Sequence, residues 1–129
     1  MGSMGLMLRA GDRFYMKGRT VTVTQMQADV GERVRDELID VAKRGQTITY
    51  GELRAAANLT HRPHGMGRLL DVISEDCRIR DEPSLAPLVV NGVTGEVGAD
   101  YEGDPEPDRQ CLYDYWSESL DPLGPERPE

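Results

Sequence analysis

Residues 49–57 read Thr-Tyr-Gly-Glu-Leu-Arg-Ala-Ala-Ala, and the fold can be worked out from this stretch. Thr49 and Glu52 have the spacing of a capping box, in which two side chains bond each other's backbone amides at the first turn of a helix. The run from Leu53 to Ala57 continues without a helix breaker. Residues 49–57 therefore predict a short helix that begins at Thr49.

Longer helices are expected on both sides of this short one. Residues 25–44 carry apolar side chains at intervals of 4, 4 and 3, which indicates an amphipathic helix that ends at Gly45. After a turn at residues 58–60, a third helix is expected from Thr60 or His61, with Pro63 in its first turn, to about Arg80. The buried positions of these two helices are predicted to be Val30, Val34, Leu38, Val41, Met66, Leu69, Leu70, Ile73 and Cys77.

Two further segments have the composition of strands. Residues 19–24 alternate Thr with Val, and residues 85–90 are mostly apolar and precede the turn dipeptide Asn91-Gly92. Gly95 and Gly98 follow closely and are expected to return the chain beside the second strand. The predicted fold class is α+β: a winged helix-turn-helix of three helices, with a short strand hairpin as the wing and an N-terminal strand.

Charge divides the chain into two parts. Residues 1–98 hold 13 Lys and Arg against 13 Asp and Glu, whereas residues 99–129 hold 2 against 10 and carry the whole net charge of −8. We assign residues 5–103 to the winged-helix domain and residues 104–129 to an acidic, proline-rich tail, which is expected to be largely extended. Residues 1–4, Met-Gly-Ser-Met, have the look of a vector-derived remainder.

Composition also suggests a compartment. The chain has two cysteines, no signal peptide and no apolar run of the roughly 18 residues that cross a bilayer. We therefore expect a reduced, cytoplasmic protein without a membrane partner.

The helix-turn-helix predicts contact with double-stranded DNA. In such motifs the N-terminal residues of the second helix lie nearest the bases of the major groove. Residues 60–70 contain no acidic residue, and the side chains offered to bases and phosphates are His61, Arg62, His64 and Arg68. The alternative is that the two arginines are ordinary surface residues and that Gly67 is a packing notch between helices.

Four short motifs carry a resemblance to a known family: Ile48-Thr49-Tyr50-Gly51-Glu52-Leu53, His64-Gly65-Met66-Gly67, Leu88-Val89-Val90-Asn91 and Gly95-Glu96-Val97-Gly98. Residues 25–103 resemble the C-terminal DNA-binding domain of the alkylated-DNA protein alkyltransferases and their alkyltransferase-like relatives. The resemblance implies that Tyr50 presses on the DNA backbone beside a flipped base. It also implies that His64 stands where the family inserts an arginine into the emptied base stack.

The same resemblance argues against alkyl transfer. The family's Pro-Cys-His-Arg-Val motif becomes Val90-Asn91-Gly92-Val93, so Asn91 falls about where the alkyl-accepting cysteine would lie. An amide cannot act as a thiolate nucleophile. Cys77 is expected inside the third helix and Cys111 in the acidic tail. We therefore predict no catalytic residue and no enzyme activity, and expect Asn91 to contact the DNA backbone from the wing.

Residues 112–120 place aromatic side chains between acidic ones. Such segments are typical of protein-binding peptides, so this part of the tail is a candidate contact for a protein partner. The alternative is that Tyr115, Trp116 and Leu120 fold back as a final helix that completes the core. An acidic tail could also lie against the basic side of the third helix and compete with phosphate.

Two functional hypotheses follow. The first is a non-catalytic winged-helix DNA-binding protein, regulatory or phage- or host-associated, with no cofactor and no metal; His61 and His64 lack a third ligand at a recognised spacing. The second is a protein-binding adaptor or inhibitor of phage or anti-restriction type on the same scaffold. The neutral balance of residues 1–98 favours the second, because DNA-binding domains generally carry a basic excess.

Overall fold

Over the residues that the structure describes, the protein folds as an α+β unit of four α-helices and two small sheets. The computed structural model describes residues 6–57, 66–98, 101 and 103–120, the side chains of residues 66–67 and 118–120 excepted. The strands are β1 (Arg13–Met16), β2 (Arg19–Thr22), β3 (Ile48–Thr49) and β4 (Val89–Val90). The helices are α1 (Gln25–Lys43), α2 (Tyr50–Ala56), α3 (Met66–Arg80) and α4 (Pro105–Leu120), with one 3-10 turn, η2 (Ala86–Leu88).

The helix starts follow local sequence closely. Thr24 caps α1 and Thr49 caps α2, each through a complete capping box in which a glutamine or glutamate three residues later bonds back to the cap. α1 ends at Arg44, and Gly45 follows with a φ of +67°, a left-handed conformation that glycine adopts without strain. The predicted ends of the first helix and the predicted start of the second are confirmed.

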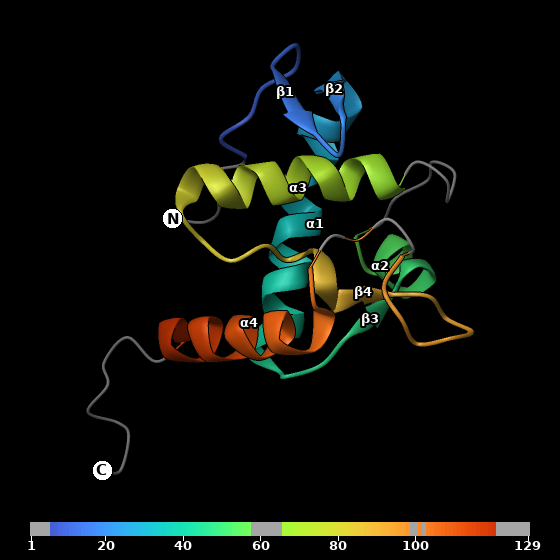
Figure 1. Cartoon of the computed structure of the whole chain (residues 1–129), viewed down its shortest axis with the longest axis vertical. Coiled ribbons are helices and arrows are strands. Elements are labelled where there is room, and N and C mark those ends of the chain that lie inside the picture. The colour runs from blue at the N-terminus through green and yellow to red at the C-terminus, as the bar shows by residue number, and fades with distance from the viewer. Residues whose placement is uncertain (1–5, 58–65, 99–100, 102, 121–129) are drawn as a thin grey trace.

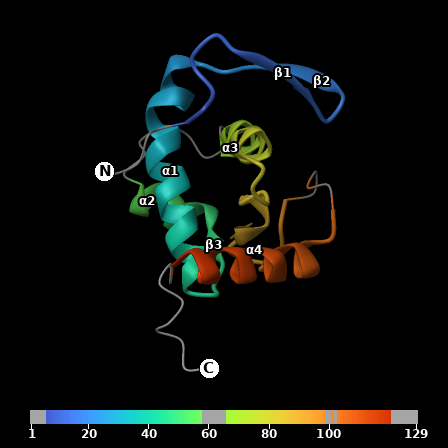
Figure 2. The same cartoon turned by 90° about the vertical axis from the view of Figure 1, so that its left-hand side faces the viewer.

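α1 is the central helix of the molecule. It contacts α2, α3, α4 and η2, and Figures 1 and 2 show it running past α3 and reaching α4 with its C-terminal half. The predicted buried stripes of α1 and α3 are confirmed wherever side chains are described, whereas Met66 lies outside that set. Leu85, Leu88, Leu112 and Trp116 complete the same cluster.

The N-terminal strand has a partner that the sequence did not indicate. β1 and β2 form an antiparallel hairpin, closed by Lys17 and Gly18 with φ angles of 55° and 81°. Positive φ at both central residues is the two-residue turn that matches the twist of a hairpin. Phe14 and Val21 face inward onto a small second core, made of Leu8, Val21, Val23 and Val72 of α3.

The expected wing differs from the observed chain. β4 pairs with β3 in parallel, Ile48 with Val89 and Thr49 with Val90, rather than with a strand that follows it. Residues 91–98 contain turns and no strand, so within the described residues the predicted hairpin after Asn91 is absent. Residues 86–88 form a 3-10 turn because Pro87 lacks the amide that a strand would need.

The acidic tail was wrongly predicted to be mainly extended. Residues 105–120 form α4, a helix of 16 residues, and Leu112 and Trp116 lie in the main core on one face of it. The fold-back alternative is the correct one for Trp116. Glu106 and Asp108 stand in the first turn, where the helix dipole favours negative charge. Among the described helices, none is both long and apolar enough to cross a bilayer.

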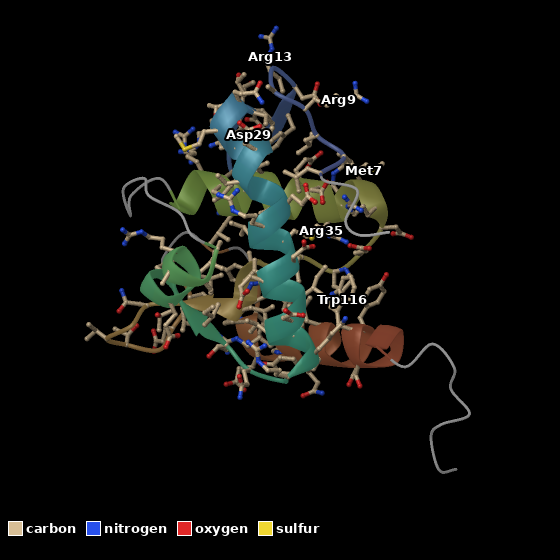
Figure 3. The ribbon with its side chains drawn as sticks, turned by 180° about the vertical axis from the view of Figure 1, so that it is seen from behind. Met7, Arg9, Arg13, Asp29, Arg35 and Trp116 are labelled. Carbon is tan, nitrogen blue, oxygen red and sulfur yellow. The ribbon has the colours of Figure 1, made fainter. Side chains whose placement is uncertain are left out.

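A buried charge cluster joins four parts of the chain. Asp76 of α3 is fully buried and accepts hydrogen bonds from the Met7 amide at 2.6 Å and from Arg80 at 2.8 Å. Arg35 of α1 pairs with Glu82 at 2.9 Å and lies over the ring of Trp116, 5.8 Å from its centre (Figure 3). Glu75 is also buried and pairs with Arg78. Glu75 and Asp76 therefore belong to the interior of the protein rather than to a solvated face of α3.

Candidate functional site

Tyr50 is the predicted contact residue that the structure places most clearly. It is the first residue of α2, directly after the Thr49 cap, and its half-buried ring packs against the main core. From this position it lines a cavity of about 420 Å³. A volume of this size lies within the usual range for small-molecule sites, roughly 300 to 1,000 Å³.

Five parts of the chain build the cavity. The hairpin turn gives Met16 and Lys17, α2 gives Tyr50, and α3 gives Leu70, Asp71 and Ser74. The segment between α3 and α4 adds a largely apolar wall, and α4 adds Asp108 and Cys111. No single stretch of sequence could have shown this site, because its walls are up to 95 residues apart in the chain.

Polar groups at the cavity are already paired with one another. Lys17 bonds Asp71 at 2.9 Å, the hydroxyls of Ser74 and Ser84 lie 2.8 Å apart, and the Tyr101 hydroxyl donates to Asp108 at 2.5 Å. Burial, and then the Asp108 carboxylate, raise the pKa of Tyr101, so its phenol stays protonated. The arrangement offers apolar surface with a few hydrogen-bonding groups at its edges.

The other predicted contacts are distributed differently. Arg68 is exposed at the beginning of α3, and His61, Arg62 and His64 lie outside the described residues. Asp71 follows Arg68 by about one helical turn and ends the stretch, residues 60–70, that contains no acidic residue. Its carboxylate is paired with Lys17. Arg68 is not among the described residues that line the cavity.

Asn91 has a structural role that the sequence did not predict. Its side-chain oxygen accepts hydrogen bonds from the amides of Val93 and Thr94, at 2.7 and 3.1 Å. Its backbone amide donates to Glu96 at 2.7 Å, and its carbonyl accepts from Gly95 at 2.8 Å. Asn91 thus closes a tight turn whose tip, Val93, is 94% exposed. The described residues place Asn91 outside the cavity wall.

The two cysteines occupy contrasting places. Cys77 is buried in the main core as predicted, and burial raises the pKa of its thiol to about 11. Cys111 is exposed on α4 and lines the cavity. Sequence reasoning missed the second position because it assigned Cys111 to an extended tail. Within the described residues, no group of three or more His, Cys, Asp or Glu is arranged to hold a metal ion.

Comparisons with known proteins give no assignment. No protein-family model matches the chain, and no curated protein or solved structure matches it either. The resemblance to the alkylated-DNA protein alkyltransferases therefore depends only on the short motifs of this chain, of which residues 48–53, 88–91 and 95–98 are described.

Proposed function

We propose that this chain is a non-catalytic DNA-binding protein whose cavity beside Tyr50 accepts an unstacked nucleobase. In this proposal α2 and α3 act as a winged-helix type of helix-turn-helix, and the turn at Asn91–Glu96 takes the place of the wing. The single observation that carries the proposal is that Tyr50 lines a cavity of suitable size. The family that these motifs resemble places its matching tyrosine beside a flipped base.

Three features of the cavity support a base as its occupant. Leu70, Val89 and Val97 offer apolar surface against which a planar ring can pack. The Ser74 and Ser84 hydroxyls can exchange their mutual hydrogen bond for bonds to the edge of a base. Exposed Arg68 lies in the first turn of α3, and recognition helices meet DNA with their N-terminal residues.

The proposal excludes chemistry at the base. Of the described charged side chains that line the cavity, Asp71 and Asp108 are acidic and Lys17 is held by Asp71. None of these supplies the neighbouring imidazole or free cation that activates a catalytic thiol. Cys111 is therefore a wall residue in this proposal, and an alkylated oligonucleotide should leave its mass unchanged.

The test measures preference for an unstacked base. Duplexes of one sequence, intact, with one mismatch or with one alkylated guanine, are compared by fluorescence anisotropy at about 50 mM salt, since phosphate contacts weaken steeply as salt rises. Damaged or mismatched bases are cheapest to extrude, so these two duplexes should bind about tenfold more tightly than the intact one.

Two variants of α4 make the test specific. Cys111→Trp places a large ring against the cavity and should abolish the preference. Gln110→Trp alters the preceding exposed residue, which is not among the described lining residues, and should retain it. Equal binding of all three duplexes by the unaltered protein would overturn the base-binding proposal.

The rival function, a protein-binding adaptor or inhibitor, is favoured by one observation. Residues 25–129 hold 11 Lys and Arg against 22 Asp and Glu, a balance that repels DNA over most of the chain. The aromatic tail supplies less to this function than the sequence suggested, because Leu112 and Trp116 are buried. Recovery of one stoichiometric, nuclease-insensitive protein partner, together with no duplex binding, would favour it.

A further inference from the structure

The N-terminal hairpin is a basic projection on an acidic protein. Residues 6–24 hold Arg9, Arg13, Lys17 and Arg19 against the single acid Asp12, whereas the remainder of the chain has twice as many acids as bases. Figures 1 and 2 show β1 and β2 beyond α3 at one end of the molecule, with α4 at the other end. The positive charge is therefore separated in space from the most acidic segment.

The register of the hairpin determines what it exposes. Arg13 pairs with Thr22 and Tyr15 with Thr20, and all four side chains are exposed on the face opposite Phe14 and Val21. Tyr15 is 73% exposed, although it is a large aromatic residue that a strand would normally cover. Figure 3 shows Arg9 and Arg13 projecting away from the protein at this end. The outer face thus combines arginine, tyrosine and threonine, side chains that commonly contact phosphate and sugar.

The hairpin is fixed relative to the cavity. Its turn contributes Met16 and Lys17 to the cavity wall, and the Lys17 bond to Asp71 ties that turn to α3 at 2.9 Å. A nucleic acid strand with one base in the cavity must continue past this wall on at least one side.

We infer that the outer face of the β1–β2 hairpin, together with the segment before β1, binds the sugar–phosphate backbone of a DNA duplex, with Arg13 of β1 and Arg9 of that segment as the main phosphate contacts. This inference rests on the proposed function. It adds a second DNA contact to the one expected from the helix-turn-helix. The hairpin binds every duplex alike, because backbone contacts carry no sequence information. It supplies affinity and orientation, whereas the cavity supplies preference for an unstacked base.

The experiment removes charge at two ends of the molecule. Arg9→Gln with Arg13→Gln neutralises the outer hairpin, and Lys43→Gln with Arg44→Gln removes the same charge at the far end of α1. Affinity for the labelled intact and mismatched duplexes is measured between about 50 and 200 mM salt, a range over which phosphate contacts change affinity strongly. All four positions lie outside the described core, and circular dichroism checks that each variant is folded.

The hairpin pair should weaken both duplexes equally, by about tenfold, and reduce the slope of log affinity against log salt by about 2, because each phosphate contact contributes about 0.9. The α1 pair should change the slope by much less. Arg9→Lys with Arg13→Lys should retain the slope, since lysine preserves the charge.

Three results would overturn the inference, and they can be told apart from failure of the proposed function. Equal effects of the two neutral pairs would assign the loss to net charge alone. An unchanged slope in the hairpin pair, with the mismatch preference intact, would remove the hairpin contact and leave the cavity proposal standing. Absence of duplex binding by the unaltered protein at about 50 mM salt would remove both.

Discussion

The two ends of the described chain dock on the central helices in opposite ways. α4 inserts Leu112 and Trp116 into the main core, and its polar side chains remain outside. The hairpin has a separate small core around Val21, and its outer face keeps Arg13 and Tyr15 exposed. α4 is therefore a structural element that happens to be acidic. The hairpin buries fewer apolar residues and leaves one whole face available to a partner.

The largest expected effect tests the structural role of α4. Trp116→Ala removes a 9% exposed ring from the main core and its contact with Arg35. We expect the free energy of unfolding to fall by about 3 to 5 kcal/mol, as for other buried large-to-small changes. Urea denaturation measures this loss, and Ser117→Ala, exposed on the same helix, should change it by less than about 0.5 kcal/mol. A Trp116→Ala loss as small as that control would mean that α4 is not part of the core.

The next effect is in the hairpin. Val21 is 1% exposed, but it lies in a cluster of only four buried residues. Val21→Ala removes two methyl groups, and we expect a loss of roughly 1 to 2 kcal/mol at about 0.8 kcal/mol for each carbon group. Denaturation by urea should show a single transition if the small core unfolds with the large one. A separate early transition would contradict the view that Lys17, Asp71 and Asp76 hold the hairpin to α3.

The smallest difference is expected between the two thiols. The experiment measures their reactivity and does not change the stability of the protein. Exposed Cys111 should react with a thiol reagent such as a nitrobenzoate disulfide at pH 8, whereas buried Cys77, whose thiol has its pKa raised to about 11, should not. The thiolate reacts, so a raised pKa lowers the reactive fraction at any pH below it. The reagent should count one thiol in the folded protein and two in urea. Two rapid thiols in the folded protein would show that the main core around Cys77 opens.

Truncation is a poor way to remove the acidic charge of this protein. A chain ending at Gly103 would lose Leu112 and Trp116 and expose the side of α1 that α4 covers. Within the described residues, the acidic segment forms α4, whose main contacts are with α1 and η2, so the position of α4 gives no support to competition with phosphate at α3. Charge neutralisation on the intact chain is the better way to separate electrostatics from folding.

Particular residues show how much of this could be predicted. Thr49 and Glu52 fixed the start of α2, and the spacing of Val34 and Leu38 gave the buried face of α1, because both signals act within one or two helical turns. Tyr50 was identified as a site residue, and the structure places it on a cavity wall. The hydrogen bonds by which Asn91 closes its turn were not predicted, since they depend on the conformation of the residues that follow it, and its contact with DNA stays a prediction.

Sequence by itself determined the first three helices, the caps of α1 and α2 and the apolar faces of α1 and α3, since these depend on residues a few positions apart. Only the tertiary structure decided that β4 pairs with β3, that an acidic segment completes the core, and that Lys17 and Cys111 share one cavity. The reason is physical: burial and pairing across long separations depend on which surfaces meet. The composition of a segment limits which surfaces it can pack against, but it does not specify which one it contacts.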